Sequence, residues 1–161
     1  MKTRDLGKTG LVVSELGMGG LFVSRFGAAF EEGRKAILKA VELGVTYIDT
    51  APGYADSEQV IGRVLPEIEA PLILSTKLGG RPQPFRPQDR DCLMASVEES
   101  LRLLGRDVID LLMIHEPDRP GQYDWWPNLG ADGAPTYLAP VVDLMLDLKR
   151  QGIIRHMGLG G

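Results

Sequence analysis

The sequence predicts an α/β protein built on a parallel β-sheet. Strand-like segments alternate with helix-like segments, and the unit of strand, loop, helix, glycine and strand recurs four times. Consecutive apolar strands joined by helices form parallel sheets with right-handed crossovers. A doubly wound sheet and a (β/α)8 barrel both satisfy this pattern. The loops that follow the strands are longer than those that precede them, which is typical of the functional face of a barrel.

The individual elements follow from periodicity and punctuation. Leu6 and residues 11–13 flank a glycine-containing turn, which predicts an N-terminal β-hairpin. Four later segments carry apolar residues at helical spacing, and Asp56 with Gln59 resembles a capping box that opens the second helix. We therefore expect helices over residues 31–43, 56–65, 88–104 and 141–151, and strands after the hairpin over residues 15–20, 45–49, 71–76, 108–114 and 153–159.

Composition and charge exclude several classes of protein. The 161 residues include 18 Lys+Arg and 22 Asp+Glu, a formal net charge of −4 that indicates neither a nucleic-acid partner nor an anionic membrane. The single Cys92 excludes an intrachain disulfide, and no run of apolar residues reaches the roughly 20 needed to span a membrane. We expect a single cytoplasmic domain over residues 1–161, without a bound metal.

Polar side chains occur where the predicted buried strands end. Asp49, Lys77 and His115 follow three successive strands, and Tyr54 lies in the loop after the first of them. Because parallel strands deliver their carboxyl ends to one rim, these groups are expected to meet there. A charge at a buried rim is costly unless it is paired, so Asp49 and Lys77 are natural partners. Asp110, inside a strand, is expected to accept backbone hydrogen bonds, and His156 is expected to face solvent beside Arg155.

This set of groups is suited to acid catalysis at a carbonyl. A free phenol, with a pKa near 10, is too weak an acid at neutral pH, and a neighbouring ammonium stabilises its phenolate. A carboxylate can hold that ammonium in place, and a histidine can orient the carbonyl oxygen beside the phenol. Protein side chains cannot supply hydride, so such a site needs a nicotinamide cofactor.

The motifs around these residues resemble those of the aldo-keto reductase family. Residues 49–62 contain Asp-Thr-Ala-x-x-Tyr followed by Ser-Glu-x-x-Ile-Gly, residues 75–77 read Ser-Thr-Lys, and residues 96–115 carry a second signature that ends at His115. The resemblance implies a (β/α)8 barrel, NADP or NAD, and a small carbonyl or sugar substrate. It implies Tyr54 as proton donor, Lys77 and Asp49 as its tuning pair, and His115 as the group that orients substrate.

The resemblance also suggests contacts for cofactor and substrate. Gly20, Leu21 and Asp49 are the expected cofactor neighbours, while Gly160 and Gly161 stand where many family members carry Ser-Asn. The loop that begins Glu116-Pro117-Asp118 is most similar to sugar-oxidising aldose dehydrogenases. Trp125 and Trp126 in that loop could stack on a sugar ring, or could pack the loop onto the barrel.

Only about five of the eight β/α units that the family barrel needs are expected here. An open five-stranded sheet has two unpaired edges and uncovered apolar surface, so we expect self-association of the isolated chain. The chain would then be a truncated part of a longer protein, a gene fragment, or a half-barrel that another chain completes. The alternative to a reductase is therefore a catalytically incomplete barrel that acts as a binding or scaffold module, or a non-functional fragment.

Overall fold

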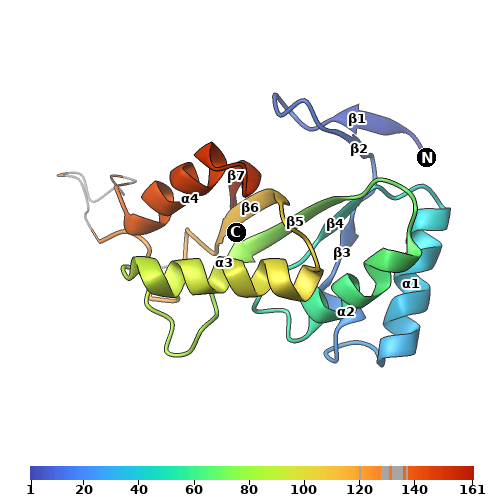
Figure 1. The fold of residues 1–161 in the computed structure, drawn as a ribbon, viewed down its shortest axis with the longest axis horizontal. Helices are drawn as coiled ribbons and strands as arrows, with labels where there is room; N and C mark the ends of the chain where they lie inside the picture. Colours follow the sequence, from blue (N-terminus) through green and yellow to red (C-terminus); the bar gives the residue numbers. More distant parts are fainter. Residues whose placement is uncertain (120, 128–130, 132–135, 137) are drawn as a thin grey trace.

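The computed structural model describes residues 1–119, 121–127, 131, 136 and 138–161 as a curved parallel sheet covered by helices (Figure 1). A separate antiparallel hairpin precedes the sheet. The strands are β1 (Thr3–Asp5), β2 (Val12–Ser14), β3 (Met18–Gly19), β4 (Tyr47–Asp49), β5 (Ile73–Leu78), β6 (Ile109–His115) and β7 (Ile154–Gly160). The helices are α1 (Phe30–Glu42), α2 (Ser57–Val64), α3 (Arg90–Leu104) and α4 (Pro140–Arg150), with the short 3-10 helices η1 (Leu21–Val23) and η2 (Leu65–Glu67).

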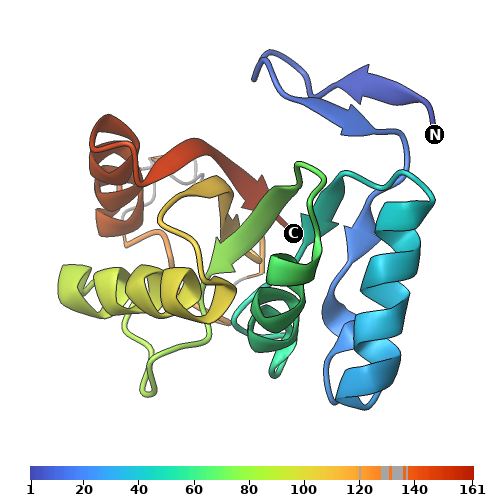
Figure 2. The same cartoon turned by 45° about the vertical axis from the view of Figure 1, so that its right-hand side comes forward.

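The strand order distinguishes between the two expected sheets. The five parallel strands pair in the sequential order β3-β4-β5-β6-β7. A doubly wound sheet reverses its strand order at a switch point, whereas sequential order with right-handed crossovers puts every helix on the same face. The four long helices indeed form one outer layer around the curved sheet (Figure 2). The architecture is therefore that of the (β/α)8 barrel, with five strands in the described residues.

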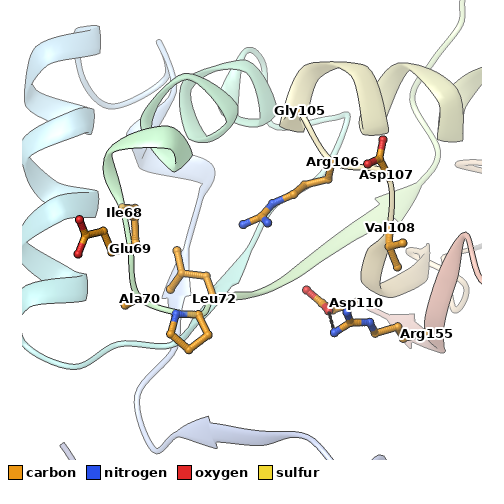
Figure 3. A pocket seen from close by; sticks show the side chains of 11 residues that line it. Ile68, Glu69, Ala70, Leu72, Gly105, Arg106, Asp107, Val108, Asp110 and Arg155 are labelled. Atoms are coloured by element: carbon orange, nitrogen blue, oxygen red, sulfur yellow. Dashed lines mark hydrogen bonds and ion pairs between the residues drawn. The ribbon is translucent and has the colours of Figure 1, made fainter.

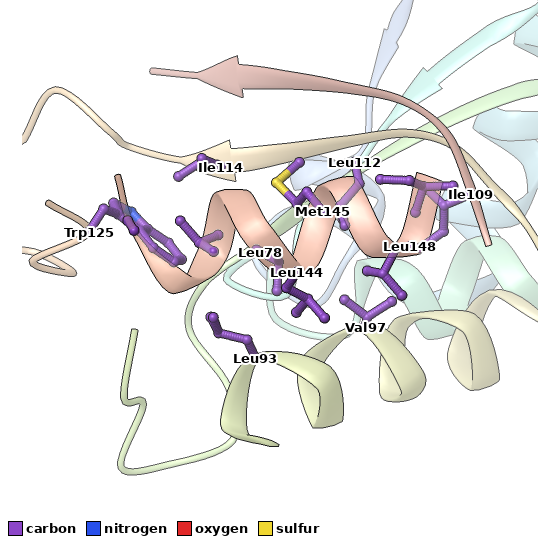
Figure 4. Packing of buried hydrophobic residues seen from close by; sticks show 13 residues of the cluster. Leu78, Leu93, Val97, Ile109, Leu112, Ile114, Trp125, Leu144, Met145 and Leu148 are labelled. Carbon is purple, nitrogen blue, oxygen red and sulfur yellow. The ribbon is translucent and has the colours of Figure 1, made fainter. Parts of the chain in front are cut away.

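Two hydrophobic clusters fill the space between the sheet and its helices. The first packs α3 and α4 against β5, β6 and β7 (Figure 4), and its fully buried members include Leu93, Leu112 and Met145. The second packs α1 and α2 against β4 and β5 around Ile37 and Ile61. Because side chains alternate across a strand, burying one face of the sheet leaves the other face to line the barrel interior.

Helix boundaries show where local sequence signals were sufficient and where they were not. Helix α3 begins at Arg90, two residues later than expected, because the Asp89 carboxylate accepts hydrogen bonds from the backbone N–H of Asp91 and Cys92. The expected capping box of α2 is wrong. The Asp56 side chain makes no capping bond and instead accepts the backbone N–H of Arg25 at 2.8 Å, which ties the loop after β3 to α2.

Glycine allows the close packing of α2 on α3. A Cβ atom at Gly62 would lie 1.9 Å from the backbone oxygen of Leu103, a distance that no side chain can occupy. Gly105 ends α3 in the left-handed conformation, with φ of +62°, as the sequence predicts. The two helices can therefore approach closely and close the outer layer beside β5.

The amino-terminal end of the sheet is held by Asp110. Its Oδ2 atom accepts the backbone N–H of Leu74 at 2.9 Å, as expected, and its Oδ1 atom pairs with Arg155 at 2.8 Å (Figure 3). The carboxylate thus joins β5, β6 and β7 at the edge of a surface cavity of about 560 Å³. His156 does not lie beside Arg155 in solvent as expected: it is half-buried, and it lies on the opposite face of β7 from Arg155.

Replacing Asp110 and Arg155 by alanine should have unequal effects. Asp110→Ala leaves the buried Leu74 N–H without an acceptor and should lower the free energy of unfolding by about 1–3 kcal/mol. Arg155→Ala removes only a partner whose side chain is 59% exposed, and should cost less than about 1 kcal/mol. Urea unfolding measures both values, and equal losses would contradict this account of Asp110.

The outer strands β3 and β7 each pair on one side only in the described part of the chain. Beside the β7 edge, Leu159 is 58% exposed, and in the segment after β3, Phe22 is 70% exposed. No helix among the described residues has both the length and the apolar character that crossing a bilayer requires.

Candidate active site

The carboxyl ends of β4, β5 and β6 bring the predicted polar groups to one cavity. Asp49 ends β4, Lys77 is the penultimate residue of β5, and His115 ends β6, while Tyr54 comes from the loop between β4 and α2. All four line a cavity of about 320 Å³ on the inner face of the sheet. The other residues that line it are Tyr47, Met113, Glu116, Gly160 and Gly161.

The buried ammonium of Lys77 is the centre of this site. Lys77 is 5% exposed, and its Nζ atom lies 2.7 Å from Oδ2 of Asp49 and 2.9 Å from the backbone oxygen of Thr50. Burying an ammonium without a partner costs several kcal/mol, so these two contacts are what allow a lysine at this position. Both acceptors come from the end of β4, which lies next to β5 in the sheet.

The Tyr54 ring lies directly beside that ammonium. The Nζ atom of Lys77 is 4.7 Å from the centroid of the Tyr54 ring, within the range of a cation–π contact. The loop that carries the tyrosine is a tight turn, in which Tyr54 donates its N–H to Ala51 and accepts from Ser57, the first residue of α2. The start of α2 therefore fixes where the phenol lies relative to Lys77.

His115 completes the site as a buried imidazole. It is 7% exposed, its ring makes an edge contact with Tyr54 at 5.8 Å between centroids, and the Tyr123 ring stacks on it at 6.0 Å. Within the described part of the chain, its buried Nδ1 atom has no hydrogen-bond partner. Burial lowers the pKa of His115, and the positive charge of Lys77 lowers it further, against the opposing effects of Glu116 and Asp49. A neutral imidazole carries one hydrogen-bond donor and one acceptor.

The lowered pKa of His115 should be visible in the folded protein. The unfolded chain, with a histidine pKa of about 6.5, binds more protons than the folded protein between the two pKa values. The contribution of His115 to stability should then be complete above about pH 6.5 and be lost as the pH falls through the folded pKa. Proton NMR of the imidazole, identified with His115→Gln, measures the midpoint. A midpoint at or above that of the urea-unfolded chain would contradict the burial argument.

Two residues of the site were not expected from the sequence: Tyr47, which lines the cavity, and Ser75, which is fully buried and bonded to Asp49. The hydroxyl of Tyr47 donates to Oγ of Ser75 at 2.8 Å, and Ser75 donates in turn to Oδ1 of Asp49 at 2.5 Å. Burial raises the pKa of Tyr47, so its hydroxyl stays protonated at neutral pH. The available signal was the alternation along each strand, which puts Tyr47 on the same face as Asp49 and Ser75 on the same face as Lys77.

The inner face of β7 has no side chains where it meets the cavity. A Cβ atom at Gly160 would lie 3.2 Å from Cε of Lys77, and one at Gly158 would lie 3.4 Å from Cγ of Met113. Gly160 and Gly161 thus present backbone, rather than side chains, to the site. The wall formed by β7 contributes peptide groups next to Lys77.

The residues expected to contact a cofactor lie close to the site, but several of their polar atoms already make hydrogen bonds within the protein. Gly20 donates its N–H to the backbone oxygen of Asp49 at 2.6 Å and accepts from Oγ of Ser57 at 2.8 Å. Leu21 follows as the first residue of η1. The two oxygens of Asp49 accept from Ser75 and Lys77. The Gly20 N–H is therefore not available to a ligand.

The two tryptophans hold the loop after β6. Trp125 is 2% exposed within the first hydrophobic cluster, and its Nε1 atom donates to the backbone oxygen of His115 at 2.8 Å. It offers no exposed ring face to a substrate. Trp126 is half-buried and donates to the backbone oxygen of Pro117 at 2.9 Å. The packing alternative thus describes Trp125, and neither ring is among the described residues that line the cavity.

Among the residues that the structure describes, no three His, Cys, Asp or Glu side chains are placed to hold a metal ion together. The site instead consists of an ammonium, a carboxylate, a phenol and an imidazole around a cavity at the carboxyl ends of parallel strands. The fold and the site together define a β/α-barrel protein whose polar centre lies at the functional rim of the sheet. Residues 15–161 match the model of the Aldo/keto reductase family, and the chain belongs to that family.

Sequence relatives with established names include two sugar-related oxidoreductases. The chain is 33% identical to 6-dehydroglucose reductase of Novosphingobium aromaticivorans over 126 residues, which are 71% of this chain and 41% of the relative. It is 29% identical to L-galactose dehydrogenase of Arabidopsis thaliana over 168 residues, which are 100% of this chain and 49% of the relative. The chain thus spans less than half the length of these relatives.

Solved structures show the same fold. An aldo-keto reductase from Pseudomonas aeruginosa matches with a TM-score of 0.78 and 31% identity, covering 99% of this chain and 59% of that one. The holo form of an aldo-keto reductase from Bacillus halodurans matches with a TM-score of 0.74 and 30% identity, covering 99% and 50%. An aldo-keto reductase from Bombyx mori in complex with NADP matches with a TM-score of 0.68 and 25% identity, covering 98% and 50%.

Proposed function

We propose that this chain carries the proton-transfer centre of an oxidoreductase that interconverts a carbonyl and an alcohol, with NADP or NAD as the hydride carrier. The observation that carries the proposal is the Lys77 ammonium, which is paired with Asp49 at 2.7 Å and lies 4.7 Å from the Tyr54 ring in a cavity shared with His115. Family membership and the oxidoreductase names of the relatives support the same reaction class.

Each residue has one task in the proposed reaction. Tyr54 donates its hydroxyl proton to the carbonyl oxygen, and the nearby Lys77 ammonium stabilises the phenolate that remains. Asp49 accepts a hydrogen bond from the Lys77 ammonium and holds it beside the ring. His115, as a neutral imidazole, contributes a hydrogen bond that orients the carbonyl oxygen beside the phenol. In the oxidative direction the same groups remove the proton from an alcohol.

The residues present fit a nicotinamide in part. The cavity at the polar centre has a volume of about 320 Å³, and Gly160 presents backbone rather than a side chain to it. Leu21 and Asp49 are the side chains that we propose as cofactor neighbours, whereas Gly20 would contribute shape rather than its N–H. When bound there, the nicotinamide supplies or accepts the hydride at the carbonyl carbon.

The proposed substrate is a small carbonyl compound or a sugar. Two relatives carry sugar-derived names, 6-dehydroglucose reductase and L-galactose dehydrogenase. Of the two tryptophans we propose only Trp126 for stacking, on a part of the substrate that extends beyond the cavity lining, since the ring of Trp125 is buried. The cavity volume of about 320 Å³ suits the reacting end of a small molecule.

Tyr54→Phe tests the proton donor with the smallest change. The variant keeps the ring beside Lys77 and removes only the hydroxyl, so turnover should fall by at least about 100-fold, as for the loss of a general acid. Nicotinamide fluorescence titration and a thermal melt should be unchanged, which separates lost chemistry from lost folding. Undiminished turnover in Tyr54→Phe would refute the assigned role.

The second candidate function is a binding or scaffold module without turnover. It is favoured by one observation, that the N–H of Gly20, an expected cofactor neighbour, is already bonded to the backbone oxygen of Asp49. Titration with NADPH and NADH separates the two candidates. Saturable binding supports the oxidoreductase, and its absence at any accessible concentration supports the module.

We further propose that the isolated chain self-associates through its sheet edges. Strands β3 and β7 have free backbone groups on one side in the described residues, and exposed Leu159 lies on the β7 edge. Light scattering should give a mass above the 17.6 kDa of one chain. Leu159→Lys should reduce that mass, because a charge on an edge strand opposes edge-to-edge pairing. A wild-type monomer with a cooperative melt would contradict the proposal.

A further inference from the structure

A chain of two hydroxyl groups ends on the oxygen of Asp49 that Lys77 does not use. Tyr47 donates to Ser75 at 2.8 Å, and Ser75 donates to Oδ1 of Asp49 at 2.5 Å. The other oxygen, Oδ2, accepts from Lys77 at 2.7 Å. Both hydrogen bonds in the chain are directed toward the carboxylate, so each donor ends on an acceptor.

This hydroxyl chain fixes the orientation of the half-buried Asp49 carboxylate. Asp49 has two equivalent oxygens, and rotation about its χ2 angle would turn the plane of the carboxylate away from the Lys77 ammonium. A short hydrogen bond to Oδ1 opposes that rotation, and charge-assisted bonds of this kind are about twice as strong as neutral ones. Ser75 is fully buried and lies directly opposite Asp49 in the β4–β5 register, so its hydroxyl has little freedom to move elsewhere.

Tyr47 fixes the serine in turn. The serine hydroxyl could otherwise rotate toward other acceptors, but it already accepts the Tyr47 hydroxyl and therefore has its own proton to give to Asp49. Tyr47 also lines the cavity that contains Tyr54 and His115, so its ring packs at the site itself. The two hydroxyls, the carboxylate and the ammonium thus form one continuous network across β4 and β5.

We propose that Ser75 and Tyr47 are positioning residues, which hold the Asp49 carboxylate in the orientation that keeps the Lys77 ammonium against Tyr54. The inference deepens the proposed function and rests on it for its catalytic meaning. The orientation of Asp49 and Lys77 can nevertheless be measured without turnover.

The test is NMR of the Lys77 ammonium in protein labelled with ¹⁵N-lysine. A buried and doubly accepted ammonium exchanges its protons slowly, so the wild type should show a protected NH₃⁺ signal that disappears in Lys77→Met. In Ser75→Ala the exchange should become at least about tenfold faster, the effect of losing one hydrogen bond to a charged group. Tyr47→Phe should shift the exchange rate in the same direction, and Ser75→Thr should restore it, because the hydroxyl is retained.

Thr76→Val is the matched control. Thr76 is also fully buried and adjacent to Ser75, but its hydroxyl donates to Glu58 on the helix-facing side of β5. Removing that hydroxyl should leave the Lys77 exchange rate unchanged. An unchanged rate in Ser75→Ala, an equal change in Thr76→Val, or the absence of any protected signal in the wild type would each overturn the inference.

A kinetic arm separates this inference from the proposed function. In protein that reduces a carbonyl, Ser75→Ala should lower kcat about tenfold with little change in KM, because the loss affects proton transfer rather than binding. A lowered kcat in Tyr54→Phe with a normal kcat in Ser75→Ala would support the reductase proposal and contradict the positioning role. Faster ammonium exchange in Ser75→Ala, without any turnover in the wild type, would support the positioning of Asp49 and contradict the reductase proposal.

Discussion

The burial of one ammonium group organises this structure. Lys77 lies on the inner face of β5, only 5% exposed, and its ammonium is compensated by the Asp49 carboxylate and the Thr50 backbone carbonyl, both within 3 Å. Those acceptors depend on the register that sets Asp49 opposite Ser75. A slip of one residue between β4 and β5 would turn Asp49 toward the helices. The pairing of these two strands and the assembly of the site are therefore the same structural requirement.

The same ammonium acts on three neighbours in different ways. It attracts the Asp49 carboxylate, it lies against the ring of Tyr54, and it lowers the pKa of His115 together with burial. An imidazole beside a fixed positive charge stays neutral and retains both a donor and an acceptor. One charge thus contacts a carboxylate and a phenol ring and helps to keep the adjacent imidazole neutral.

The meeting of the polar groups at one end of the sheet could be predicted because each strand and its polar end can be recognised from the local sequence. Asp49, Lys77 and His115 stand at the ends of apolar segments, and successive parallel strands bring such ends together. Ser75 and Tyr47 escaped prediction because serine and tyrosine are ordinary strand residues, and their partners are set by the register between strands. The capping box predicted at Asp56 was wrong for a related reason. The Asp56 carboxylate accepts the backbone N–H of Arg25, a residue 31 positions away that no local motif indicates. The burial of Trp125 could not be predicted either, because it depends on how the long loop after β6 packs on the hydrophobic core.

The glycines of β7 have a consequence for how ligand preference can change in this protein. The wall that β7 presents to the cavity is main chain, and a methyl group at Gly160 would press on the Lys77 side chain. A side chain at Gly160 would therefore require a small shift of the Lys77 side chain. The segments that follow β5 and β6 carry no such constraint, because their length and composition can vary while the β-strands beneath stay constant.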